Sequence, residues 1–318
     1  MIHLRVVAPP ELAAPAVACL TRSEAVSSVV HLRGAATKPA GDLILCDVAR
    51  EQASVLVAEL TALGLAESGS ITIEEAPTVL SAAADRAERA APDLAFGDQV
   101  VWEDVEARTS EETALSVNFV EFMLIAGMLA AIGILLDSPI LIVGAMVVGP
   151  EFGPLAALCV ALVQKRAGLA RRSAVALAAG FGAVIPVVYA ATAVFRAVGV
   201  APQVFPEHPL TLFISNPDLF SFLVAYMAGT AGILSLTSAK SGALVGVLIS
   251  VTTIPAAANI GVAGAYSQWG EVRGAVLQLV LNLVAIVAGG VARMLVQRRV
   301  YLRRARLASP ARTPKGEF

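Results

Sequence analysis

Residues that could do chemistry gather in one apolar segment of this sequence, Gly144-Ala-Met-Val-Val-Gly-Pro-Glu-Phe-Gly-Pro154. Its middle holds a single carboxylate, that of Glu151. Two glycines and two prolines flank this carboxylate: Gly149, Pro150, Gly153 and Pro154. Because each proline removes a backbone donor and clashes with the preceding turn, the segment predicts a break in a helix. A carboxylate at such a break could bind a cation, shuttle a proton or cap exposed backbone amides.

The predicted break lies inside an apolar run, from Pro139 to Val163, that is long enough to cross a bilayer. A spanning helix has to satisfy its own backbone hydrogen bonds, because hydrocarbon offers no partners. Interrupted backbone at that depth is tolerated only where protein or a water-filled cavity surrounds it. The sequence therefore predicts a polytopic α-helical membrane domain with a polar centre, and Glu151 is its deepest candidate.

A second interruption follows in the C-terminal half and resembles the first. Leu141-Ile-Val-Gly-Ala-Met-Val-Val and Ala243-Leu-Val-Gly-Val-Leu-Ile-Ser are similar, and each precedes a proline, Pro150 or Pro255. Three spans in each half would give the halves opposite orientations, so we expect a 3+3 inverted repeat with interrupted second helices. Paired interruptions of this kind predict a binding site near the midplane of the bilayer.

Polar residues near the two interruptions complete the predicted site for a substrate or ion. Beyond Glu151 and the residues beside it, the candidates are Thr252, Thr253, Pro255, Asn259 and Glu121. Gln278 and Asn282 lie in the last span, where such side chains often hydrogen bond to neighbouring helices as packing contacts. Glu121 lies early in the first span and could instead reach water at the cytoplasmic interface.

Composition supports the membrane assignment, because 57% of the residues are hydrophobic and the mean hydropathy is +0.76. The apolar excess lies after residue 116. Six spans of about 20 residues are expected there: 117–136, 140–163, 173–195, 220–238, 242–264 and 273–296. Dense small residues, such as those of Gly229-Thr-Ala-Gly232, predict close helix packing and favour a homo-oligomer.

The distribution of lysine and arginine predicts the orientation of the spans. These residues cluster between the second and third spans, between the fourth and fifth, and after the sixth: Lys165, Arg166, Arg171, Arg172, Lys240, Arg298, Arg299, Arg303, Arg304 and Arg306. The alternate connections are nearly free of them. With no signal peptide recognisable after Met1, we expect a multi-pass protein of the plasma membrane with both termini in the cytoplasm.

The part of the chain before the spans predicts a separate cytoplasmic domain. Residues 1–76 alternate β-rich runs at 2–8, 26–33, 43–48 and 70–74 with helices at 10–21 and 51–63, and they include a turn at 34–41. This βαββαβ order is typical of a ferredoxin-like α/β domain. Three further parts are expected: an acidic helical connector at 77–115, the six-span membrane domain at 116–298 and a basic cytoplasmic tail at 299–318.

The sequence offers no motif for an enzyme, a metal centre or a cofactor. Cys19, Cys46 and Cys159 fit neither a disulfide framework nor a zinc site by their spacing. The patterns HExxH, GxSxG and the P-loop are missing. We therefore expect no enzymatic activity, no cofactor and no metal. The expected partners are the lipid bilayer, an unknown small solute or ion and further copies of the chain, with no nucleic acid.

The run from Ser138 to Pro154 resembles the hydrophobic domain of a bacterial and archaeal membrane family, the domain-of-unknown-function family 389. Ser221–Gly232 and Gly246–Pro255 resemble its later segments, so the resemblance covers about residues 112 to 296. It implies the membrane architecture more than an activity. This family often has apolar residues where the chain has Glu151 and Phe152, and the resemblance therefore implies no role for Glu151.

Two functions remain open from the sequence. One is a transporter or channel for a small solute or ion, with a midplane site at the broken helices and with the cytoplasmic domain as a regulator. The alternative is a non-transporting membrane sensor or scaffold, in which the N-terminal domain binds a small ligand or a partner. No sequence feature names the solute.

Overall fold

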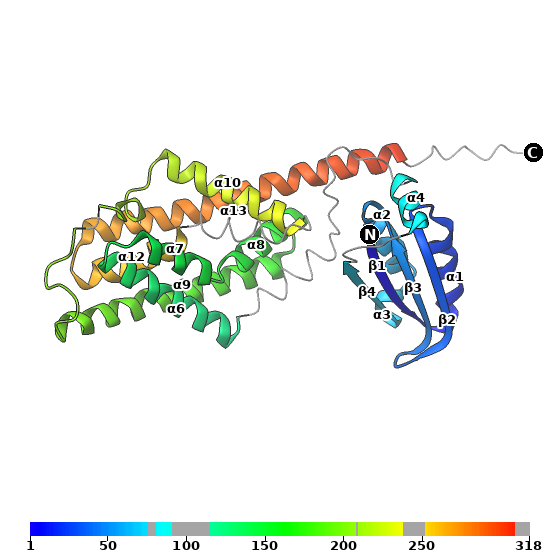
Figure 1. Ribbon diagram of the computed structural model, residues 1–318, viewed down its shortest axis with the longest axis horizontal. Helices are drawn as coiled ribbons and strands as arrows, with labels where there is room; N and C mark the ends of the chain where they lie inside the picture. Colours follow the sequence, from blue (N-terminus) through cyan, green and yellow to red (C-terminus); the bar gives the residue numbers. More distant parts are fainter. Residues whose placement is uncertain (76–80, 91–114, 208, 238–251, 309–318) are drawn as a thin grey trace, which may run out of the picture. The chain divides into compact units, whose positions relative to one another are not determined.

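The computed structural model describes residues 1–75, 81–90, 115–207, 209–237 and 252–308. The chain divides into two compact units, Met1–Val105 and Glu106–Phe318, and each is described here by itself (Figure 1). The first unit is an α/β domain. The second unit is built of apolar helices.

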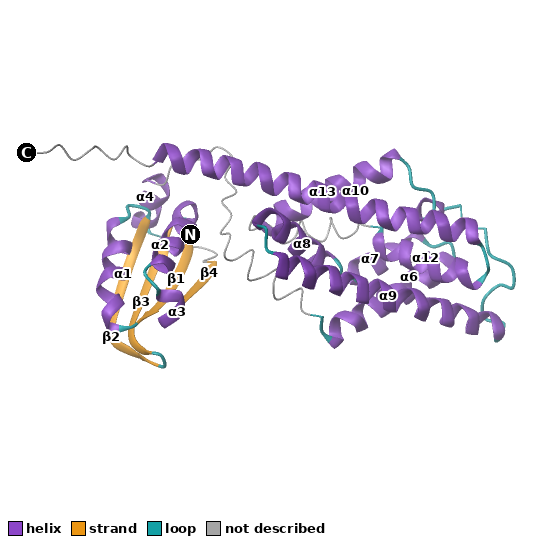
Figure 2. Ribbon diagram, turned by 180° about the vertical axis from the view of Figure 1, so that it is seen from behind, coloured by secondary structure: helices purple, strands orange, loops and turns teal. Residues whose placement is uncertain are grey.

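The N-terminal unit is a four-stranded antiparallel sheet with two main helices (Figure 2). Its elements are β1 (Ile2–Ala8), α1 (Pro10–Arg22), β2 (Val26–Thr37), β3 (Ala40–Val48), α2 (Arg50–Ala62), α3 (Leu65–Ser68), β4 (Ser70–Glu75) and α4 (Ala82–Ala90). The strands lie in the order β2-β3-β1-β4. This is the βαββαβ arrangement that the sequence predicted, with the short helix α3 as an addition.

Alternation along the strands explains why both helices cover one face of this sheet. Every second residue of β1 is buried, and these residues share one core with the buried side chains of β3, α1 and α2. Successive strand residues point to opposite faces, so a core that uses only the alternate residues lies on one side of the sheet. Val30 and Leu32 of β2 remain 46% and 44% exposed.

The hairpin between β2 and β3 is longer than the sequence predicted. Residues 34–41 were expected to form a turn, but β2 extends to Thr37 and β3 begins at Ala40. The two strands stay paired because a register shift between Leu32 and Ala36 absorbs Gly34, whose φ of 61° suits a residue without a side chain. Glycine within a strand therefore marked a bulge and not the end of the strand.

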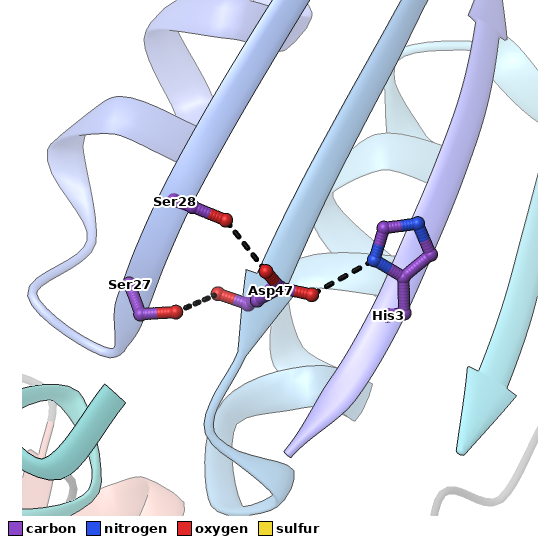
Figure 3. A network of polar contacts seen from close by, with 4 residues as sticks. All are labelled: His3, Ser27, Ser28 and Asp47. Carbon is purple, nitrogen blue, oxygen red and sulfur yellow. Dashed lines mark hydrogen bonds and ion pairs between the residues drawn. The ribbon is translucent and has the colours of Figure 1, made fainter. Parts of the chain in front are cut away.

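A polar network joins three strands at one end of the sheet (Figure 3). The Asp47 carboxylate accepts a hydrogen bond from the Ser28 hydroxyl at 2.7 Å and lies 2.8 Å from Nδ1 of His3. Partial burial raises the pKa of the Asp47 carboxyl, but these hydrogen bonds outweigh burial and hold the pKa below its usual range. The network fastens β1, β2 and β3 together.

In its described residues, the second unit is built of helices joined by loops (Figure 2). They are α6 (Val117–Leu135), α7 (Pro139–Val148), α8 (Phe152–Gln164), α9 (Ala167–Ala197), the 3-10 helix η1 (Leu212–Ile214), α10 (Leu219–Thr237), α12 (Thr253–Ala265) and α13 (Trp269–Ala308). Helix α8 packs against α9 and α13, and α12 packs against α13 and α9. The two short helices α8 and α12 therefore share the same two long neighbours.

Among the described residues, four helices are long and apolar enough to cross a membrane: α6, α9, α10 and α13. A fifth span is present if α7 and α8, which bend by 55° at their junction, count as one broken span. Most of the predicted fifth span, 242–264, falls outside the described residues or in α12, whose 13 residues reach only about 20 Å. Six spans are therefore not confirmed.

Two helices are longer than the spans predicted for them. Helix α9 has 31 residues where 173–195 was expected, and α13 has 40 residues where 273–296 was expected. Their lengths, about 46 and 60 Å at the usual rise, exceed the hydrocarbon thickness of about 30 Å. Charged residues end the apolar pattern but do not end a helix, which explains the difference.

Glycines bring the helices of this unit into close contact. A Cβ atom added at Gly229 of α10 would collide with the Ile286 carbonyl of α13, and one at Gly289 would collide with the Tyr226 carbonyl of α10. Gly261 of α12 lies in the same way against the Ile185 carbonyl of α9. Small residues thus allow backbone contact, as expected for helices that associate without a hydrophobic driving force between them.

The predicted external connections meet at one end of the helical unit. In the turn after α6, the Asp137 carboxylate accepts hydrogen bonds from the amide and the hydroxyl of Thr211, both at 3.0 Å. Arg196, near the end of α9, lies over the Tyr266 ring at 4.2 Å, and the Tyr266 hydroxyl donates to the Pro202 carbonyl. At the other end, Arg298 of α13 donates to the Val163 carbonyl of α8.

We predict that a fragment ending at Ala76 folds alone, because its core is complete within β1–β4 and α1–α3. Circular dichroism should show a mixed α/β spectrum with cooperative thermal unfolding. Leu60→Ala, at a fully buried position, should lower the free energy of unfolding by about 2–5 kcal/mol, whereas Leu32→Ala on the exposed face should cost far less. A random-coil spectrum of the unaltered fragment would contradict the prediction.

Candidate functional site

The predicted break is present between α7 and α8. Helix α7 ends at Val148, Gly149 and Pro150 are non-helical, and α8 starts at Phe152 directly after Glu151. Gly149 allows a close approach, since a Cβ atom there would collide with the Glu151 carboxylate and would contact Ile254 at 2.7 Å. Glycine therefore leaves room at this point for the side chains of Glu151 and Ile254.

The second proline of the segment does not break a helix, as the sequence had suggested. Pro154 is the third residue of α8, and Pro255 is likewise the third residue of α12. The first backbone N–H groups of a helix have no partner within the helix, so a proline there removes no hydrogen bond. Both prolines mark the start of a short helix.

One hydrogen bond joins the two helix starts. The Thr253 hydroxyl, at the first residue of α12, donates to Oε1 of Glu151, which precedes α8, at 2.8 Å. Both side chains are buried, with Glu151 2% and Thr253 0% exposed. Helix N-termini carry partial positive charge, so a carboxylate between two of them is in a favourable electrostatic position.

The other carboxylate oxygen of Glu151, Oε2, has no hydrogen-bond partner among the described residues. None of the ion pairs found in the described part of the chain involves Glu151. An ionised carboxylate in such surroundings is costly unless a cation, a proton or water compensates it. Glu151 is thus chemically equipped to exchange one of these partners.

A chain of polar side chains starts next to Thr253. Asn282 of α13 donates from Nδ2 to the Thr252 hydroxyl oxygen at 2.6 Å, and Gln278 donates from Nε2 to Oδ1 of Asn282 at 3.2 Å. Gln278 and Asn282 are 2% and 1% exposed, and Oε1 of Gln278 has no partner in the described residues. Because Thr252 and Thr253 are neighbours in sequence, this row of polar side chains lies next to the hydrogen bond between Thr253 and Glu151.

A pocket of about 510 Å³ adjoins this row of polar side chains along its whole length. Its lining comes from the segment before α10, from α10 itself, from Thr252 and from α13: Leu212, Phe213, Asn216, Asp218, Phe220, Ser221, Val224, Ala225, Thr252, Gln278 and Asn282. Volumes of 300–1,000 Å³ are typical of pockets for small molecules. The pocket thus lies between the segment before α10 and the buried polar groups Thr252, Gln278 and Asn282.

Asp218 is the charged residue of this lining. It caps the N-terminus of α10, because its Oδ1 accepts hydrogen bonds from the Ser221 amide at 2.7 Å and the Ser221 hydroxyl at 2.8 Å. These bonds hold the pKa of the Asp218 carboxyl below its usual range, so the group is ionised near neutral pH. The sequence analysis missed this residue, although Asp218 three positions before Ser221 is a helix-cap pattern.

The predicted site residues are only partly brought together. Gly149, Pro150, Gly153, Pro154, Glu151, Thr252, Thr253 and Pro255 all lie at the junction of α7, α8 and α12. Asn259 is buried on α12, seven residues after Thr252 and so on the same face, with no partner for Oδ1 among the described residues. Glu121 is exposed in the first turns of α6, and no contact between it and the junction is found among the described residues, so its part in the site stays a prediction.

Gln278 and Asn282 were expected to form packing contacts between helices. Asn282 does hydrogen bond to Thr252 at the start of α12, and both Gln278 and Asn282 also line the pocket. Among the described residues there is no group of three His, Cys, Asp or Glu side chains that could hold a metal ion. The junction is built from one carboxylate, hydroxyls and amides, which suit protons and cations bound through oxygen.

We predict that Thr253→Val destabilises the full-length protein, because it leaves a buried carboxylate without its described hydrogen bond. The loss should be about 1–3 kcal/mol, seen as a lower Tm in detergent. Thr253→Ser keeps the hydroxyl and should stay much closer to the unaltered protein. Equal losses in the two variants would show that the methyl group matters and the hydrogen bond does not.

Comparisons with known proteins show what this helical unit is similar to. Residues 146–288 match the model of the domain of unknown function DUF389. An uncharacterised protein of Methanocaldococcus jannaschii is 26% identical over 197 residues, which cover 59% of this chain and 57% of that protein. The chain thus matches little more than half the length of this relative. No solved structure matches.

These matches confirm the resemblance seen in the sequence. The matched range begins in α7 just before Glu151 and ends in α13 just after Asn282. It therefore includes the whole junction and the polar chain. Over residues 146–288 the chain is therefore similar to DUF389, a domain of unknown function.

Proposed function

We propose that the protein is a transporter or channel for a small solute or ion, with its site where the two interrupted helices meet. The supporting observation is the hydrogen bond between Glu151 and Thr253, which joins the starts of α8 and α12 beside a polar chain that leads to a pocket. Broken helices whose ends meet in the interior are typical of the binding sites of secondary transporters. The proposal includes no enzymatic activity.

The lengths and spacing of the helices support a 3+3 inverted repeat with six spans. Helices α6 and α10 both have 19 residues, and α8 and α12 both have 13. The number of residues between the first residue of α6 and that of α10, of α8 and that of α12, and of α9 and that of α13 is the same to within one. The packing of α8 and α12 against both α9 and α13 is the pairing that a two-fold relation requires.

The ends of the helices support an orientation with both termini in the cytoplasm. The connections at Asp137, at 198–207, at 209–218 and at Tyr266 gather at one end, and they are poor in lysine and arginine. Arg298 and the basic turn after α8 lie together at the other end. The positive-inside rule then assigns the basic end to the cytoplasm of a cell whose plasma membrane holds the protein.

A second candidate function is that of a sensor or scaffold that transports nothing. The N-terminal unit favours it, because one face of its sheet carries partly exposed apolar residues such as Val30 and Leu32. Such a face suits a ligand, a partner or a second copy of the chain, and hence a homo-oligomer. The same unit could also regulate transport, and a flux measurement separates the two functions.

We predict that a membrane-impermeant maleimide labels Glu207→Cys from outside intact cells and labels Gly168→Cys only after permeabilisation. Both positions are exposed, and the native cysteines Cys19, Cys46 and Cys159 are buried, which keeps background labelling low. Labelling of both new cysteines from the same side would contradict the proposed orientation.

We predict that Glu151→Gln lowers solute or proton flux into proteoliposomes by at least about tenfold, equivalent to about 1.4 kcal/mol. The amide keeps the size of the side chain but cannot ionise, so a proton or a cation can no longer be exchanged there. Flux should be followed with an internal pH dye and with sodium and potassium indicators, at matched protein density.

Glu121→Gln is the matched control, because the same change occurs at an exposed position of α6. It should leave flux close to that of the unaltered protein. Unchanged flux in Glu151→Gln would remove Glu151 from the mechanism and leave it as a helix cap. No flux of any ion in the unaltered protein would favour the sensor or scaffold function.

A further inference from the structure

The charge of the pocket lining points to the class of solute. Asp218 lines the pocket, and no lysine, arginine or histidine stands among the described lining residues. Arg196 is engaged at the outer end with the Tyr266 ring and the Ala265 carbonyl, and Arg298 is engaged at the other end with the Val163 carbonyl. Arg273 is exposed. Among the described lining residues, the pocket thus presents the negative charge of Asp218 and no positive charge.

The neutral groups of the lining also favour a positive ligand. Oε1 of Gln278 is a buried acceptor without a partner in the described residues, and Gln278 lines the pocket. The amides of Gln278 and Asn282 each spend a donor within the polar chain, on Asn282 and on Thr252. An unpaired buried acceptor costs free energy that a cation or an ammonium N–H can recover.

A second carboxylate stands behind the polar chain. Thr252 belongs to the pocket lining, and the next residue, Thr253, binds Glu151. The groups around Glu151 on α7, α8 and α12 are apolar or uncharged among the described residues, so no protein cation compensates it. A positive solute in the pocket would therefore be attracted by Asp218 in the lining and by the Glu151 carboxylate beyond Thr252 and Thr253.

We propose that this pocket binds a small cation, held by the oxygens of Asp218, Gln278 and Asn282. The inference rests on the proposed function and specifies its solute class. The volume of about 510 Å³ exceeds what a bare metal ion fills, so the cation enters with water or as a small ammonium compound. An anion would meet Asp218 and the unpaired Oε1 of Gln278, with no basic side chain among the described lining residues.

Thermal unfolding of the full-length protein in detergent tests binding without reference to transport. At constant ionic strength, N-methylglucamine chloride is replaced stepwise by sodium, potassium or methylammonium chloride. A ligand that binds the folded state raises Tm with a saturating dependence on its concentration. We expect such a rise for at least one of these cations, and the cation that acts distinguishes an inorganic ion from an ammonium compound. Replacing chloride by gluconate should change nothing.

Two variants locate the effect. Gln278→Met, similar in size but without the amide, should raise the half-saturating cation concentration at least tenfold, and Gln268→Met in the exposed turn before α13 should not. Asp218→Asn, at an exposed cap, should weaken binding while the protein stays folded. A Tm shift that follows the anion, no shift with any cation, or an unchanged shift in both Gln278→Met and Asp218→Asn would overturn the inference.

The results also separate this inference from the proposed function. Cation binding without flux would retain the pocket and reject transport. Flux without any cation-dependent Tm shift would retain transport and reject the cation pocket.

Discussion

The arrangement of the helical unit depends on one constraint: polar groups at a helix break in an apolar interior need partners. The hydrogen bond from Thr253 to Glu151 supplies a partner at the break between α7 and α8, and it fixes the start of α12 at the same place. Unpaired polar groups at that depth cost several kcal/mol each, so such a break must be closed by protein contacts. The glycine at position 149 and the prolines in the first turns of α8 and α12 serve this one contact.

The rest of the unit follows from bringing two short helices to one point. Because α8 and α12 each start in the interior, both need long neighbours that continue past them, and α9 and α13 fill this role. Close approach of the neighbours requires residues without side chains, as at Gly229, Gly261 and Gly289. Asp137, after α6, and Arg196, near the end of α9, hydrogen bond to Thr211 and Gln203 in the segment between α9 and α10. A polar interior with a pocket beside it is the consequence.

Patterns that depend on local chemistry could be predicted from the sequence. Alternation of apolar residues predicted the βαββαβ unit, and proline beside glycine and Glu151 predicted the break. Contacts between distant residues could not be read in this way. Thr253 pairs with Glu151, 102 residues away, and Asn282 pairs with Thr252, 30 residues away, so both contacts depend on how separate helices pack. Asp218 was missed because a helix cap at the surface looks the same whether or not a pocket lies beside it.

The contact between Glu151 and Thr253 is tested most directly by a double-mutant cycle. Apparent stability in detergent is measured for Glu151→Gln, Thr253→Val and the double variant. A control cycle combines Glu151→Gln with Thr192→Val, which changes a buried threonine on a different helix, α9. If the two residues join the helix breaks, the two effects are not additive, with a coupling free energy of about 0.5–3 kcal/mol, and the control cycle is additive. Additive effects of Glu151→Gln and Thr253→Val would show that the breaks are not joined by this contact.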